Sequence, residues 1–158
     1  MTEKSLRDRL IGAWSLISYE ERPVDGSPSF YPMGTNPKGI IMYAPDCFMS
    51  AQLSKPDRKP FASGDWFVAT DAEFKGEATS YIAYTGPFHV DKAKQHLTHS
   101  MFISLFPNWI GQTQARNVRI EGDRLFLGSA SPISSSGKTV MSYLEWRRAD
   151  VTAMAPGK

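Results

Sequence analysis

Two residues of this chain, His99 and Arg116, have the side-chain chemistry of a proton-transfer or anion-binding site. His99 shares the alternation phase of Leu97 and Met101, and Arg116 shares the phase of Val118. In a half-buried strand that phase faces the core. A neutral imidazole there can move a proton, and a guanidinium can stabilise developing negative charge. Because both groups are costly to bury without partners, the pattern predicts an interior polar site.

Each of the two residues also has a structural interpretation. His99 is either a core histidine bonded to a carbonyl or a tyrosine, or an acid–base or hydrogen-bonding group inside a cavity. Arg116 needs acceptors, so it either forms a salt bridge with a carboxylate such as Glu145, contacts an acidic or enolic oxygen of a ligand, or lies exposed. Gln114 shares the phase of Arg116 and is expected to join either network.

Aromatic residues make up 12% of the chain, and several are candidates for lining a cavity. Tyrosines would line it with hydroxyl groups, and a tryptophan at the Pro107–Gly111 corner would cover its mouth. The alternative for every one of them is ordinary core packing. The candidate ligand-binding residues are Gln114, Tyr43, Tyr81, Tyr84, Trp109, Trp146 and Glu145, with Tyr143 as a further tyrosine.

The sequence favours neither a metal nor a cofactor. Its three histidines are His89, His96 and His99, and the last two point to opposite faces of one strand. We therefore expect no metal site, because two histidines without a carboxylate or thiolate make a poor one. No phosphate-binding loop, dinucleotide fingerprint, catalytic triad or paired-carboxylate motif is present, so any chemistry would be cofactor-free.

The composition is that of a soluble globular protein. The 158 residues carry a net charge of +2 without a basic run, which argues against nucleic acid and membrane surfaces as partners. The single Cys47 excludes an internal disulfide, and the charged N-terminus does not resemble a signal peptide, so we expect a cytoplasmic protein. Residues 1–150 are predicted to form one domain, and residues 151–158 a flexible tail.

Short strands separated by turn residues dominate the predicted elements. Trp14 and Leu16 lie on one face of the first strand and Ile17 and Tyr19 on the other, which indicates burial on both sides or a β-bulge near Leu16. One helix is predicted over 71–84, where a capping box precedes an apolar stripe expected to pack on the sheet. A strand near 47–53 could be an edge that pairs with a second copy, so both monomer and homodimer are open.

About eight to ten strands with one short helix predict a mainly β protein, an antiparallel barrel that can enclose a small ligand. Its closing pair would join the Trp14 region to the Trp146 region. Five fragments strengthen this interpretation: LIGAWSLISYEER (10–22), PMGTNPKGIIMYAPDCFMSAQL (32–53), YIAYTGPFHVD (81–91), HSMFISLFPNWIGQTQAR (99–116) and YLEWRR (143–148). Together they resemble the lipocalin-like domain family of small stand-alone bacterial and fungal proteins.

The resemblance implies a lipocalin-like barrel with an internal cavity, and it leaves three functions open. The chain would bind a small hydrophobic or aromatic molecule without catalysis. Alternatively, it would be a cofactor-independent cyclase or isomerase of natural-product biosynthesis, with His99 moving a proton and Arg116 stabilising negative charge. In the third interpretation the chain is a structural protein whose barrel is filled by its own side chains.

Overall fold

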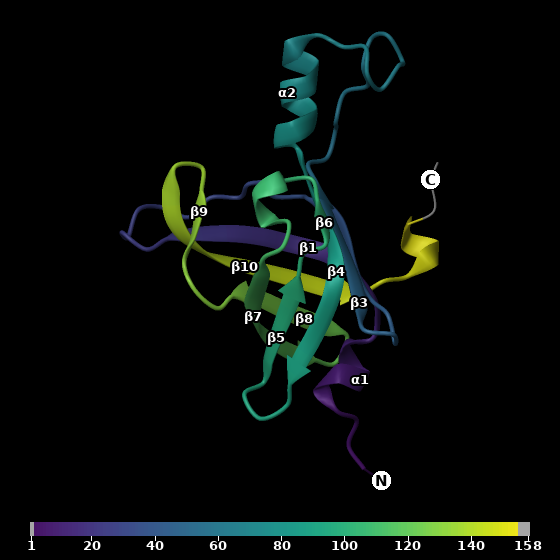
Figure 1. The fold of residues 1–158 in the computed structure, drawn as a ribbon, viewed down its shortest axis with the longest axis vertical. Coiled ribbons are helices and arrows are strands. Elements are labelled where there is room, and N and C mark those ends of the chain that lie inside the picture. Colours follow the sequence, from purple (N-terminus) through teal and green to yellow (C-terminus); the bar gives the residue numbers. More distant parts are fainter. Residues whose placement is uncertain (1, 155–158) are drawn as a thin grey trace.

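Strands with alternating apolar and polar residues pair in antiparallel fashion and close into a barrel (Figure 1). The structure, a computed structural model, describes residues 2–154. Eight strands form the wall: β1 (Gly12–Pro23), β2 (Lys38–Tyr43), β3 (Phe48–Ser54), β4 (Tyr81–Asp91), β5 (His96–Ser100), β7 (Thr113–Glu121), β8 (Arg124–Ser129) and β10 (Lys138–Arg148). They follow one another around the barrel in this order, and β10 pairs with β1. The predicted barrel and its closing pair are confirmed.

A β-bulge in β1 changes which of its residues face inward. The pairing of β1 with β10 slips between Leu16 and Ser18, so the bulge predicted near Leu16 is confirmed. Trp14 and Leu16 are buried before the slip, and Tyr19 and Glu21 are buried after it. The extra residue thus turns the second half of the strand by one position and brings a carboxyl group to the inner face.

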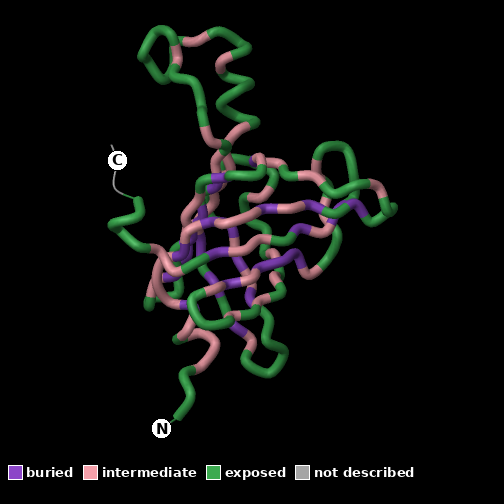
Figure 2. The backbone as a smooth tube through the Cα atoms, turned by 180° about the vertical axis from the view of Figure 1, so that it is seen from behind, coloured by how far each residue is buried: buried purple, intermediate pink, exposed green. Residues whose placement is uncertain are grey.

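The two ends of the barrel are built differently (Figure 1). At one end lies α1 (Leu6–Leu10), which begins at the N-cap Ser5, and its Leu10 is fully buried. The indole Nε1 of Trp14 donates a hydrogen bond of 2.9 Å to the carbonyl of Leu10 and holds α1 on the core. The other end carries three short elements: β6 (Ile103–Ser104), the 3-10 helix η1 (Pro107–Trp109) and β9 (Ile133–Ser135). The buried residues lie between these ends (Figure 2).

The helix prediction was right about the start and wrong about the end and the packing. Helix α2 (Asp71–Thr79) begins at Thr70, whose capping box with Glu73 is present. It ends before Tyr81, because the residues from there on pair with β3 as strand β4. No residue of α2 is buried, and the helix projects from the barrel together with the preceding loop (Figures 1 and 2). Phe74 packs on Phe61 of that loop, with ring centroids 5.6 Å apart, and not on the sheet.

The predicted edge strand and the predicted C-terminal tail differ in their outcomes. Strand β3 pairs with β2 on one side and β4 on the other, so the prediction of an edge strand near 47–53 was wrong. After β10, Val151–Met154 form the exposed 3-10 helix η2. The rest of the predicted tail, 155–158, lies outside the described residues. None of the helices described in residues 2–154 is long and apolar enough to cross a membrane.

Candidate functional site

His99 lies on the inner face of β5, as its phase predicted, and is only 1% exposed. Its Nε2 shares a hydrogen bond of 2.8 Å with the hydroxyl of Tyr43, which is equally buried. Its other ring nitrogen, Nδ1, has no hydrogen-bond partner among the described residues. The ring is therefore fixed at one nitrogen and free to form a hydrogen bond at the other.

Burial keeps both members of this pair neutral. It lowers the pKa of His99 well below 6.5, and the nearby Arg116 guanidinium lowers it further. Burial also raises the pKa of the Tyr43 hydroxyl well above 10; Tyr84 adds to this rise and Arg116 opposes it. At neutral pH the pair thus presents an uncharged imidazole and an uncharged phenol beside a cation.

A column of rings connects this pair to the end of the barrel that carries η1. Tyr84 of β4 lies with its ring centroid 5.9 Å from that of His99 and meets Trp109 edge-to-face at 5.7 Å. Trp109 in turn meets Phe106 at 5.5 Å. On the far side of His99, Tyr43 packs on Phe88 at 5.0 Å. Trp109, near the outer end of this column, is half-buried.

Arg116 faces the same interior from β7. On this strand, half-buried residues alternate with exposed ones, and Arg116 is among the half-buried set that includes Gln114. Its guanidinium donates to Gln114 Oε1 at 2.5 Å and to the carbonyl of Ala115 at 3.2 Å. No carboxylate of residues 2–154 lies within 4.0 Å of it. The cation is therefore held in place without being neutralised.

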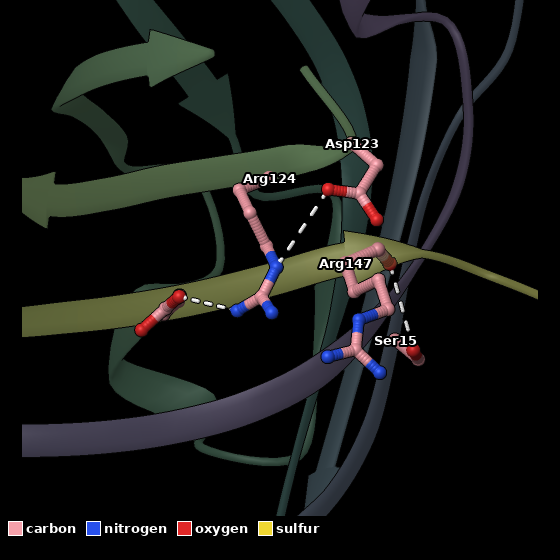
Figure 3. A network of polar contacts seen from close by, with 5 residues as sticks. Ser15, Asp123, Arg124 and Arg147 are labelled. Atoms are coloured by element: carbon pink, nitrogen blue, oxygen red, sulfur yellow. Dashed lines mark hydrogen bonds and ion pairs between the residues drawn. The ribbon is translucent and has the colours of Figure 1, made fainter. Parts of the chain in front are cut away.

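The predicted alternative of an Arg116–Glu145 salt bridge is wrong. Glu145 lies on the outer face of β10, where Arg124 contacts it at 2.7 Å. Figure 3 shows Arg124 on this outer network, reaching toward Asp123 at 3.7 Å. Trp146 is buried in the core, so the alternation of the strand places Glu145 outside.

Two of the tyrosines predicted to line the interior also lie outside it. Tyr81 donates a hydrogen bond to the exposed Gln52 and lies under the guanidinium of Arg58, 4.9 Å from its ring centroid. Tyr143 is 40% exposed. The interior tyrosines are Tyr43, Tyr84 and Tyr19, the last of which was not among the predicted lining residues.

Tyr19 and Glu21 are the site residues that sequence reasoning missed. Tyr19 is 7% exposed and donates a hydrogen bond to Glu21 Oε1, while Glu21 Oε2 is buried without a partner in the described chain. Burial raises the pKa of Tyr19, and the adjacent Glu21 raises it further. Tyr84 adds to this rise and Arg116 opposes it. The bulge near Leu16 was the available signal, because it moves Tyr19 and Glu21 to the inner face.

Trp146 is the third residue with a buried, unpartnered polar atom, its indole Nε1. It is 1% exposed and belongs to the close-packed core cluster with Trp14 and Leu125. The interior therefore has a densely packed part around the tryptophans. Its other part contains the half-buried Tyr84, Gln114 and Arg116, which solvent can reach.

Two hollows outside the barrel are alternative places for a ligand, each about 820 Å³. One lies between the loop 55–66 and α2, and the other between β1, the segment 36–40 and η2. Neither is lined by any of the three unpartnered buried atoms. In residues 2–154, no three His, Cys, Asp or Glu side chains are arranged to hold a metal ion. The barrel interior is thus the better candidate site.

The buried state of His99 predicts how stability depends on pH. Between the lowered pKa of the folded protein and the value of 6.5 for an unfolded chain, only the unfolded chain binds the proton. The free energy of unfolding is therefore unaffected by His99 above pH 6.5. As the pH drops below 6.5, the free energy of unfolding decreases by up to about 1.4 kcal/mol per pH unit. We expect His99→Gln to have a shallower decline than the wild type in urea unfolding between pH 7 and pH 5.

The matched controls are His89→Gln and His96→Gln, since both of these histidines are exposed on the outer face. They should keep the wild-type pH dependence, because neither side chain is removed from water when the protein folds. Equal slopes in His99→Gln and the wild type would show that His99 is protonated in the folded protein.

Comparison with known proteins agrees with this architecture. A family model described as a lipocalin-like domain matches residues 11–149, which include all eight barrel strands. The 4'-hydroxy-3'-methoxypropiophenone carrier protein of Aspergillus oryzae is 35% identical over 106 residues, which make up 63% of this chain and 96% of that protein. The family-model match runs from the first barrel strand to the last, and the chain therefore belongs to the lipocalin-like domain family.

Proposed function

We propose that this protein binds and carries a small aromatic molecule in the barrel interior, and that the molecule is a hydroxyaryl ketone. The observation that carries the proposal is the set of interior polar atoms left without partners beside a column of aromatic rings. Rings offer apolar contact to a planar ligand, and a few convergent polar groups fix its orientation. The ketone class is supported by the name of the Aspergillus oryzae relative, a carrier of a hydroxylated propiophenone.

The contacts define roles for individual residues in this proposal. Tyr84 lies between His99 and Trp109 and would pack on the ligand ring, with Trp109 covering the entrance. Arg116 and Gln114 would bind an acceptor such as the ketone oxygen, since the guanidinium has no carboxylate partner. His99 Nδ1 would contribute one hydrogen bond. The half-buried state of Tyr84, Gln114 and Arg116 favours an accessible interior over a barrel filled by side chains.

Calorimetric titration with 4'-hydroxy-3'-methoxypropiophenone tests the proposal. We expect one molecule to bind per chain, and Tyr84→Ala to bind it about tenfold more weakly through the loss of ring contact. The control is Tyr143→Ala, which removes a tyrosine from the outer face beneath Arg22 and should leave the affinity unchanged. No binding to the wild type, or equal losses in the two variants, would contradict the proposal.

The alternative of a cofactor-independent cyclase or isomerase has one observation in its favour. His99 is neutral, has an unpartnered nitrogen and lies near a cation that could stabilise an enolate. Mass spectrometry and NMR of the ketone recovered after incubation separate the two functions. A carrier returns the ketone unchanged, whereas an isomerase or cyclase converts it.

A further inference from the structure

Glu21 is a buried carboxyl group of which only one oxygen is bonded. It is 1% exposed; Oε1 accepts a hydrogen bond from Tyr19, and Oε2 has no partner in the described chain. A buried carboxylate oxygen without a donor is costly, so such groups are retained where something completes them. The proposed function uses His99, Arg116 and Gln114 and leaves Glu21 without a role.

No cation of the described chain neutralises Glu21. Its neighbours in sequence, Glu20 and Arg22, pair with each other at 3.1 Å on the outer face, and Arg22 also covers the ring of Tyr143 there. Arg116 is bonded to Gln114, on another part of the wall. Tyr19 therefore orients the Glu21 carboxyl group, and a hydrogen-bond donor for Oε2 must come from a molecule outside the described chain.

The strand register places Glu21 and Arg116 at two ends of one row across the barrel wall. Glu21 pairs with Ser142 of β10, the backbone N–H of Ser142 donates to Ser129 Oγ of β8, and Ser129 pairs with Arg116 of β7. Three strand spacings, about 14 Å along the wall, separate the backbones of Glu21 and Arg116, and both side chains extend from the wall into the barrel interior. Ser142 and Ser129 are small, so the row has long polar side chains only at its ends.

We propose that Glu21, oriented by Tyr19, accepts a hydrogen bond from a hydroxyl group of the ligand, while Arg116 binds an acceptor at the ligand's other end. This inference rests on the proposed function and narrows its ligand class. The ligand is an aromatic molecule that carries a hydroxyl donor and a carbonyl acceptor at opposite ends of its ring system. Glu21 is then the residue that selects the free phenol over its alkylated forms, because it has no hydrogen to offer an ether oxygen.

The test compares three probes on the full chain by calorimetry: 4'-hydroxypropiophenone, 4'-methoxypropiophenone and 4'-methylpropiophenone. The wild type should bind the hydroxy compound about tenfold more tightly than either of the others, since they leave the carboxylate unpaired. In Glu21→Gln the preference over the methoxy compound should fall to about threefold or less, because the amide N–H can donate to the ether oxygen. The control is Glu20→Gln, which changes the adjacent carboxyl on the outer face and should keep the wild-type preference.

Each result has a definite meaning. Preference for the hydroxy compound that persists in Glu21→Gln would show exclusion of the methyl group by size and would overturn the inference. The hydroxy and methyl compounds are similar in size. If the wild type binds these two compounds equally, the inference is overturned even if Glu21→Gln does not fold. If the wild type binds none of the three ketones, the proposed function fails as well. If it binds all three alike, only the role of Glu21 fails.

Discussion

Arg116→Leu is expected to weaken ligand binding at least tenfold while leaving the free protein as stable as the wild type or more so. The guanidinium is half-buried, and its acceptors are an amide oxygen and a backbone carbonyl of its own strand. Desolvating a cation without a counter-charge is unfavourable, and replacing such groups by apolar ones is often neutral or stabilising by about 1 kcal/mol or more. Leu97 on the neighbouring strand offers an apolar contact to the new side chain.

The same substitution should change the titration of His99. Arg116 is the second cause, after burial, of the lowered pKa of this imidazole. Without the cation, the pKa of His99 should rise but remain below 6.5, because the ring stays buried. Side-chain NMR across a pH series measures this shift directly, and it is independent of any ligand.

Urea unfolding and calorimetry with 4'-hydroxy-3'-methoxypropiophenone measure the other two effects. Arg119→Leu is the matched control, because Arg119 lies on the outer face of the same strand and pairs there with Glu121. It should leave the affinity unchanged. A loss of more than about 1 kcal/mol in Arg116→Leu together with unchanged affinity would assign Arg116 a structural role instead.

Alternation along single strands predicted much of this site. The inner positions of β7, which include Gln114 and Arg116, follow from the two-residue period, as does the burial of His99. The same rule places Glu145 outside, next to the inward Trp146, so the suggested pairing with Arg116 conflicted with information already in the sequence. Which side chains then meet across the barrel, such as Tyr43 and His99, depends on register between strands distant in sequence.

Sequence reasoning failed where local patterns supported two structures. Tyr81 and Ile82 continue the helical spacing of Phe74 and Ala78, but they also begin a strand, and pairing with β3 decides between the two. The bulge in β1 was foreseen, yet its effect on Tyr19 and Glu21 required its position to within one residue. A one-residue shift exchanges the inner and outer faces, which is why the most deeply buried carboxyl group was missed.

Gly86→Ala is expected to lower the free energy of unfolding by about 3 kcal/mol, the upper range for overpacking a core. A Cβ at this inward position of β4 would lie 1.8 Å from the carbonyl oxygen of Ser100 and 2.9 Å from the backbone nitrogen of Phe102. Ser100 is the last residue of β5 and Phe102 lies in the turn after it. This turn is held by the hydrogen bond of 2.9 Å from Phe102 N–H to the carbonyl of Thr85. Neither β4 nor the turn after β5 can move away from the new Cβ without breaking backbone hydrogen bonds of this kind.

The control for Gly86→Ala is Gly76→Ala in α2. A Cβ there meets nothing within 4 Å, and alanine favours a helix over glycine by about 0.8 to 1 kcal/mol. Since α2 buries no residue, this gain should appear in helical circular dichroism and local hydrogen exchange and hardly in the global unfolding transition. Urea unfolding of the two variants thus separates a steric effect from a general effect of replacing glycine.

The consequences of Gly86→Ala extend to the site, because the displaced turn directly follows the strand that carries His99. The N–H of Met101 is bonded to the carbonyl of Gln112 at 2.8 Å, so moving this turn also moves the start of β7 and with it Gln114. We therefore expect the folded fraction of Gly86→Ala to bind 4'-hydroxy-3'-methoxypropiophenone more weakly than the wild type. A variant as stable as the wild type would show that β4 and the turn after β5 are not in this close contact.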